Sequence, residues 1–193
     1  TREPSRQFSA SGSVDLGSLN QQRLSAYVSS PLGSDNLRGS VSVYSGKRDG
    51  YMDNVATGTA GGTEDVRSAR VKLLFKPSKG LDVTLAADSL RDRSVSASPR
   101  ILTGYGLVPG ADEFTSNVNQ PTLASRNVQG LGITVNYDLG NGLQLTSITS
   151  KRTLDTNRAS DTDVGPVNIV ASASTSKQDQ WSQELRVATT GNA

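Results

Sequence analysis

The clearest structural signal in the sequence is the run Gly130-Leu131-Gly132-Ile133-Thr134-Val135-Asn136-Tyr137. Large apolar residues alternate there with Gly, Thr and Asn, which is the period of a β-strand with one apolar and one polar face. The run ends in Asp138-Leu139-Gly140-Asn141-Gly142, which is a turn by its composition, before Leu143 and Leu145 open another strand. This part of the chain predicts an antiparallel hairpin.

The same alternation occurs along most of the chain and predicts eight strands. Ile148 is out of step in the seventh, which predicts a bulge or an early strand end there. No stretch keeps the three-and-four apolar spacing of a helix. The expected strands are Gln7–Leu16, Arg23–Ser30, Leu37–Tyr44, Ala69–Lys76, Leu81–Asp88, Gly130–Tyr137, a segment from Leu143, and Gln180–Val187.

The connections between these strands alternate in length. Short turns are expected at Pro31–Asn36, Pro77–Gly80 and Asp138–Gly142, and long connections at about Lys47–Asp65, Arg91–Asn127 and Arg152–Lys177. Outer-membrane barrels have short turns on one side and long loops on the other. The predicted fold is therefore an all-β, antiparallel up-and-down transmembrane β-barrel, with a soluble sandwich as the alternative that periodicity alone leaves open.

Composition excludes several classes of function. The 193 residues include no Cys and no His, which excludes zinc or haem ligation by His or Cys, disulfides and a Ser-His nucleophile pair. The 20 Lys and Arg against 18 Asp and Glu leave a net charge of +2, too little to indicate nucleic acid as the main partner. No carboxylate pairs with a base or nucleophile at a telling spacing, so neither an enzyme nor a cofactor is expected.

The two faces of the expected strands differ in charge. Most apolar faces carry no Lys, Arg, Asp or Glu, and a charge at the middle of a bilayer would cost about 2–4 kcal/mol. The polar faces carry both signs, and in a barrel these side chains would face the lumen and pair with one another. The expected lumen-facing residues are Arg38, Arg70, Lys72, Asp82, Asp88, Glu184 and Arg186.

Several stretches resemble TonB-dependent receptors, the 22-stranded transporters of Gram-negative outer membranes. Two positions depart from the family's motifs, since Leu19 stands where Tyr is common and Ser30 stands where Gly is common. The stretches occur in family order and cover almost the whole chain. They are Ser13–Asn20, Ser30–Leu32 with Leu37–Gly39, Lys47–Asn54, Leu73–Pro77, Tyr137–Thr149 and Asp179–Val187.

This resemblance implies that residues 1–193 form about the first eight barrel strands, with the plug domain, the TonB box and the remaining strands outside the chain. A complete eight-stranded barrel is a rival interpretation. The long loops and the ending Thr189-Thr190-Gly191-Asn192-Ala193, which lacks a terminal aromatic residue, count against it.

The resemblance also implies a function in the Gram-negative outer membrane. We expect a monomer that takes up a scarce nutrient such as an iron-siderophore chelate, energised by the TonB–ExbB–ExbD complex and surrounded by lipid and lipopolysaccharide. One alternative is TonB-dependent uptake of another small molecule, such as an aromatic acid, a saccharide or cobalamin. An alternative of another class is a secreted or surface β-rich binding protein or adhesin without transport.

Candidate ligand-binding residues lie in the expected third and fourth outer loops. Aromatic and cationic side chains there could stack on an aromatic ligand and pair with its negative charge. Loop packing and lipopolysaccharide contact are the alternative roles. The Asp161-Thr162-Asp163 stretch is expected to be a solvated acidic loop, because two carboxylates are few for calcium. The ligand candidates are Arg100, Tyr105, Phe114, Arg152, Asn157 and Arg158.

Overall fold

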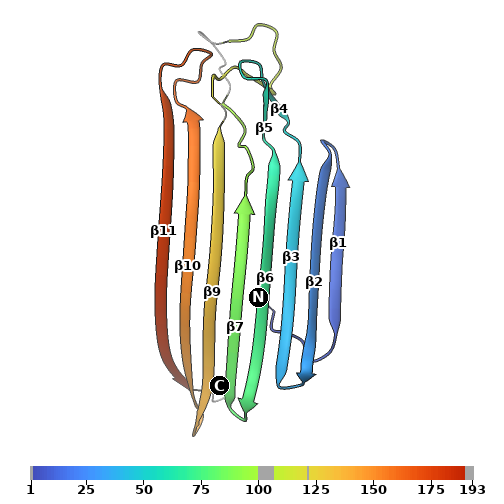
Figure 1. Cartoon of the computed structure of the whole chain (residues 1–193), viewed down its shortest axis with the longest axis vertical. Helices are drawn as coiled ribbons and strands as arrows, with labels where there is room; N and C mark the ends of the chain where they lie inside the picture. Colours follow the sequence, from blue (N-terminus) through green and yellow to red (C-terminus); the bar gives the residue numbers. More distant parts are fainter. Residues whose placement is uncertain (1, 100–106, 121, 190–193) are drawn as a thin grey trace.

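Eight long strands form a single antiparallel sheet, in which neighbours in the chain are neighbours in space (Figure 1). The computed structural model describes residues 2–99, 107–120 and 122–189. The order along the sheet is β1 (Ser9–Gly17), β2 (Gln21–Ser34), β3 (Leu37–Arg48), β6 (Glu64–Ser78), β7 (Leu81–Asp92), β9 (Leu123–Gly140), β10 (Leu143–Asp161) and β11 (Ala171–Thr189).

Tight turns join the strands at one end of the sheet, which we call the short-turn end. Only Asn141 and Gly142 separate β9 from β10, with φ of 53° and 72°. Positive φ at both positions is the requirement of a type I′ hairpin turn, and Asn-Gly meets it at the least steric cost. Lys79 and Gly80 likewise separate β6 from β7.

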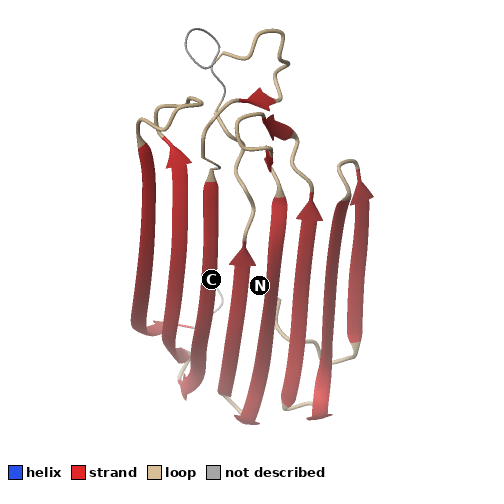
Figure 2. Ribbon diagram, turned by 45° about the horizontal axis from the view of Figure 1, so that its top comes forward, coloured by secondary structure: helices blue, strands red, loops and turns tan. Residues whose placement is uncertain are grey.

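The opposite end, the long-loop end, carries a second and smaller sheet (Figure 2). It contains β4 (Met52–Asn54), β5 (Thr59–Gly61) and β8 (Thr115–Ser116), in the order β5-β4-β8. β4 pairs antiparallel with β5 and parallel with β8, so the small sheet joins the loop after β3 to the loop after β7.

No second layer of described residues packs on the large sheet to form a hydrophobic core. Among the residues that the structure describes, Met52, Leu74 and Val118 are the only buried large apolar side chains. The chain exposes 12370 Å², whereas a compact monomer of 20.3 kDa would expose about 8,800 Å². The sheet therefore needs further protein, lipid or both to cover its faces.

The sheet is open. Within the described part of the chain, β1 pairs only with β2 and β11 pairs only with β10. A closed eight-stranded barrel would require β1 to pair with β11, so the rival interpretation of a complete small barrel is wrong. None of the described segments forms a helix that is long and apolar enough to span a membrane.

The prediction of eight antiparallel strands is confirmed, but several strands are longer than expected. β6 begins at Glu64 and β9 at Leu123, both well before the expected positions. β10 continues without a register shift through Ile148 to Asp161, so the predicted bulge or early end there is wrong. The expected fourth loop is reduced to residues 162–170.

Candidate functional site

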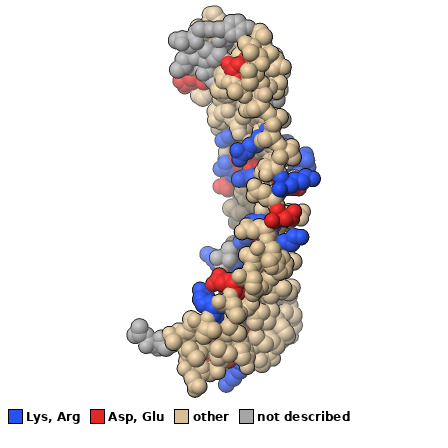
Figure 3. Space-filling model, turned by 90° about the vertical axis from the view of Figure 1, so that its left-hand side faces the viewer, with Lys and Arg blue, Asp and Glu red and all other residues tan. Residues whose placement is uncertain are grey.

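Alternation gives the large sheet an apolar face and a polar face. On the apolar face, no described residue is charged from the short-turn end up to the first charges, which are Lys47, Arg67, Arg91, Lys151 and Asp179. Typical residues of that face are Val41, Val71, Leu85, Ile133, Val135 and Leu185. Viewed from the β11 edge, charged side chains gather mainly around the middle of the molecule (Figure 3).

The seven residues expected to face a lumen all lie on the polar face by strand register. At its centre, Asp88 of β7 bridges two arginines. Arg70 Nη2 lies 3.2 Å from Asp88 Oδ1, and Arg152 Nη2 lies 3.4 Å from the same oxygen. Gly130 of β9 stands between Asp88 and Arg152 in register, and a Cβ there would lie 2.9 Å from Asp88 Oδ1. The glycine therefore leaves the space through which this pair forms.

A second ion pair of the polar face also joins two strands across the strand that lies between them. Arg23 of β2 donates to Glu64 of β6 at 2.6 Å, and the Tyr44 hydroxyl of β3 donates to Glu64 at 2.9 Å. Gly46 of β3 lies opposite Arg23, and a Cβ there would come within 2.6 Å of the Tyr44 hydroxyl. Glycine again opens the path between charges two strands apart.

The segment before β1, residues 2–8, crosses the polar face over the middle of the sheet (Figure 1). Arg38 is buried and donates to the Pro4 carbonyl at 3.3 Å, and Lys72 donates to the Arg2 carbonyl at 3.2 Å. The Ser29 hydroxyl accepts a hydrogen bond from the Ser5 amide at 2.7 Å. Arg38 and Lys72 thus hold backbone that runs across this face.

The other polar-face residues form simpler pairs. Asp82 accepts from Lys76 at 2.6 Å near the short-turn end. Glu184 and Arg186 lie on β11, 4.0 Å apart and more than half exposed. β11 is the edge strand, and no described strand pairs with its outer side, which explains the exposure of both side chains.

A cavity of about 330 Å³ opens on the polar face at the long-loop end. Arg48, the last residue of β3, lies with its guanidinium carbon 5.5 Å from the centre of the Tyr51 ring. Phe114 meets the same ring edge to face, with centroids 6.3 Å apart. One Arg48 nitrogen donates to the Gly62 carbonyl at 2.6 Å, while the buried Arg48 Nε has no hydrogen-bond partner among the described residues.

The lining of this cavity has an excess of positive charge. Arg126 pairs with Asp92 at 3.1 Å, so this charge is balanced. Arg158 of β10 also lines the cavity and forms no side-chain hydrogen bond or ion pair with any residue in the described ranges. Arg158 therefore leaves one guanidinium group without a carboxylate partner among the described residues, and Arg48, with Glu64 opposite it in register, adds a second positive charge beside an aromatic ring. This combination suits an anionic aromatic group.

The structure brings only part of the predicted ligand set together. Phe114 contacts Tyr51, which borders the cavity, and Arg158 lines it. Asn157 lies in β10 with its side chain bonded to Thr175 at 2.9 Å, on the face opposite Arg158. Arg152 belongs to the Asp88 cluster further down the polar face. The placement of Arg152, Asn157 and Arg158 in a loop was wrong, because β10 extends to Asp161. Arg100 and Tyr105 lie outside the described residues.

Two buried polar side chains connect the loops above the cavity. Asn54 donates to the Val118 carbonyl at 2.8 Å and accepts from the Val118 amide at 3.2 Å. Asp161 accepts from the amides of Asn119, Val164 and Gly165 at 3.1, 2.9 and 3.3 Å. These backbone donors occupy the Asp161 carboxylate, and the described residues contain no acidic cluster that could hold a metal ion.

Sequence reasoning missed the residues of this end that lie inside expected loops. Glu64, Tyr51 and Asn54 all fell within the long connection expected after the third strand. Glu64 lies on the polar face because the alternation of β6 extends toward the N-terminus as far as this residue, so the alternation could have predicted its position. Tyr51 and Asn54 lie in the receptor-like stretch Lys47–Asn54, but no local pattern predicted their contacts with Phe114 and Val118, which are about 60 residues away in the chain.

An open, one-layer sheet defines a segment of a large antiparallel barrel when one face is apolar and free of charge over the part near the short turns and the other face carries ion pairs. Solved structures of receptors have this fold. The ferric yersiniabactin uptake receptor FyuA from Yersinia pestis matches 100% of the chain with a TM-score of 0.79 and 21% identity. The siderophore receptor PiuA from Acinetobacter baumannii matches 98% with a TM-score of 0.76 and 13% identity. FpvA from P. aeruginosa, solved bound to heterologous pyoverdines, matches 96% with a TM-score of 0.72 and 16% identity.

The chain spans 29%, 28% and 25% of the lengths of those three receptors, so it corresponds to a part of each. At these identities the likeness shows the fold, and the predicted resemblance to a receptor barrel is confirmed at that level. No protein-family model matches the sequence, and no curated protein matches it.

Proposed function

We propose that the chain is the first part of the barrel of a TonB-dependent receptor, which imports a ferric siderophore across the outer membrane of a Gram-negative bacterium. The observation that supports this most strongly is the contrast between the two faces of one open sheet. The apolar face suits lipid, and the ion-paired polar face suits an enclosed lumen filled by a plug domain. The overlap with three siderophore receptors along 96–100% of the chain supports the same assignment.

Strand length agrees with this placement. The 19 residues of β10 extend about 60 Å, whereas the apolar band of a membrane barrel is about 25 Å tall. Even with the usual tilt, half of β10 would project beyond the membrane. The cavity beside Arg48 and Arg158 then faces the exterior, at the mouth of the lumen.

This cavity is the proposed entry site for the ligand. Siderophore chelates are commonly anionic, and the guanidinium groups of Arg48 and Arg158 supply complementary charge. Tyr51 and Phe114 supply aromatic surface for a catecholate or chromophore. Residues of the plug, which lies outside this chain, would complete the site, and TonB would act on the plug to open the path.

The test is uptake of radiolabelled iron carried by a panel of catecholate and hydroxamate siderophores. Cells expressing the full receptor should accumulate iron from at least one of them, and deletion of TonB should abolish that uptake. Unchanged uptake without TonB would contradict energised transport. A full-length protein that stays in the aqueous phase without detergent would contradict the membrane barrel and favour a surface binding protein.

A further inference from the structure

Three arginines lie on the apolar face near the long-loop end, on the opposite side of the sheet from the cavity described above. Arg67, Arg91 and Arg93 surround a small cavity of about 110 Å³ with Asp65. All three arginines are exposed, and none forms a side-chain hydrogen bond or ion pair with another residue of the described ranges. Lys47 lies directly opposite Asp65 in register and adds a fourth cation.

This arrangement differs from that of the polar face. There Arg23, Arg70, Arg126 and Arg152 each have a carboxylate partner. Around the small cavity, Asp65 is the single acid beside three arginines, and Arg67 and Arg91 are direct cross-strand neighbours. Asp155 lies in the same register row on β10, separated from Arg91 by Asn127 of β9. Like charges directly opposite one another on a sheet are destabilising. An anion bound between them would remove that repulsion.

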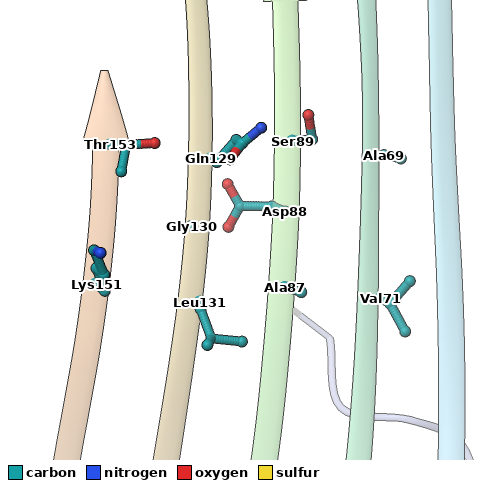
Figure 4. Close-up of a pocket in the computed structure, with 10 residues that line it drawn as sticks. All are labelled: Ala69, Val71, Ala87, Asp88, Ser89, Gln129, Gly130, Leu131, Lys151 and Thr153. Carbon is teal, nitrogen blue, oxygen red and sulfur yellow. The ribbon is translucent and has the colours of Figure 1, made fainter. Parts of the chain in front are cut away.

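An apolar groove begins one residue pair below the arginines. Ala69 and Ser89 pair directly below Arg67 and Arg91 in register, and both line a groove of about 450 Å³. Figure 4 shows the small side chain of Ala87 between the larger Val71 and Leu131 on three neighbouring strands. Small residues thus create a depression along the sheet, and Lys151 flanks it as a further cation.

We propose that the three arginines and this groove form a site for a phosphorylated, acylated lipid of the surrounding membrane leaflet. The lipid phosphate would lie between Arg67, Arg91 and Arg93, because guanidinium groups bind phosphate oxygens in a bidentate manner. An acyl chain would lie in the groove over Ala69 and Ala87, next to Leu131. This site rests on the proposed function to the extent that the apolar face must be in a membrane.

The site selects such a lipid by requiring both parts. A free phosphate ion would use the arginines but leave the groove empty. A neutral lipid would fill the groove but leave adjacent like charges unneutralised. A phosphorylated lipid with acyl chains matches both, in the order that strand register fixes: charge towards the loops and apolar groove towards the short turns.

The experiment measures retention of bisphosphorylated hexa-acyl lipid A by the purified full-length receptor, using native mass spectrometry. The test variant carries Arg67→Gln, Arg91→Gln and Arg93→Gln. The control variant carries Lys177→Gln and Lys79→Gln. Lys177 lies on the same face and in the same register row as Arg67 and Arg91, but directly opposite Asp155. Lys79 lies at the short-turn end. Because each arginine near an anionic lipid surface contributes roughly a fivefold factor, the triple variant should bind about 100-fold more weakly, and the control should bind like the wild type.

Two further arms separate the sources of binding. Lipid A without phosphates should bind the wild type no better than it binds the triple variant. Inorganic phosphate at millimolar concentration should not displace lipid A from the wild type. Ala87→Leu, which fills the groove without changing charge, should also weaken retention. Equal retention by the wild type and triple variant, or competition by inorganic phosphate, would overturn the site.

Siderophore uptake by the triple variant keeps this result separate from the proposed function. Uptake should remain, because Arg67, Arg91 and Arg93 lie on the face opposite the entry cavity. Loss of lipid retention with normal uptake supports both proposals. Unchanged retention with normal uptake contradicts the lipid site alone, and a receptor without TonB-dependent uptake contradicts the proposed function alone.

Discussion

Arg152 of β10 reaches Asp88 of β7 across the intervening strand, with Arg152 Nη2 3.4 Å from Asp88 Oδ1. The contact depends on Gly130 of β9, which has no side chain to block it. Arg23 and Glu64 repeat this geometry across Gly46 of β3. Paired charges therefore tie together strands that share no backbone hydrogen bonds, and the glycines between them have a specific structural role.

Gly130→Ala should break the Asp88–Arg152 pair, because the new Cβ would lie 2.9 Å from the Asp88 carboxylate and 3.0 Å from Arg152 Nη2. Gly132→Ala is the matched control on the same strand and face, since its Cβ would approach nothing closer than 3.8 Å. A partly exposed ion pair contributes up to about 1 kcal/mol. Thermal unfolding followed by heat-modifiable gel mobility should show a lower midpoint for Gly130→Ala than for Gly132→Ala, and equal midpoints would show that the pair is not stabilising.

Glu64→Gln should destabilise the sheet by about 1–2 kcal/mol, because both Arg23 and Tyr44 lose a charged acceptor. The matched control is Glu184→Gln, whose partner Arg186 lies 4.0 Å away and is more than half exposed. That control should leave stability unchanged. Chemical denaturation of the two variants in the same detergent gives the comparison, and an equal loss in both would contradict the role assigned to Glu64.

The sequence predicts the strands best where one face is apolar. The alternation is clear in β9, where Gly132 and Thr134 separate the apolar residues Leu131, Ile133 and Val135. A period of two arises there because the two faces of the strand have different environments. Above the apolar band both faces are polar, so the alternation disappears although the strand continues. This is why the expected β9 began at Gly130 instead of Leu123, and why β10 was cut short before Asp161.

The candidate site could be predicted only in part for the same reason. The alternation of apolar and polar residues within each strand was enough to predict that Arg70 and Asp88 lie on the polar face. The meeting of Tyr51 with Phe114 depends on the small sheet that joins two loops, and pairing between distant loops leaves no local period. The residues of the cavity therefore emerge from the fold and not from any single motif.

Asp161→Asn should loosen the long loops without affecting the large sheet. The Asp161 carboxylate accepts three backbone hydrogen bonds from two loops, and an amide replaces one of its acceptor oxygens with a donor. Limited proteolysis should cut the loop of residues 162–170 faster, while the unfolding midpoint stays unchanged. Asp163→Asn is the control, because among the described residues its carboxylate accepts only from the Val170 amide. Faster cleavage in that variant alone would contradict the assignment.

Arg158→Gln should weaken ligand binding about tenfold, the size expected for a lost hydrogen bond to a charged group. Stability should not fall, because Arg158 has no partner among the described residues. Competition for a radiolabelled ferric siderophore on whole cells measures the affinity. Lys177→Gln, which changes the same charge on the opposite face, should bind normally, and identical affinities for both variants would exclude Arg158 from the entry site.

Spin-label accessibility along β9 tests most directly whether the apolar face of this sheet meets lipid while the polar face does not. The chain has no Cys, so single cysteines at positions 131 to 136 can be labelled one at a time in the full receptor reconstituted into bilayers. Positions 131, 133 and 135 should be accessible to oxygen, which concentrates in lipid, and positions 132, 134 and 136 should not. Uniform access to a water-soluble relaxation agent at all six positions, with no period of two, would contradict the membrane barrel.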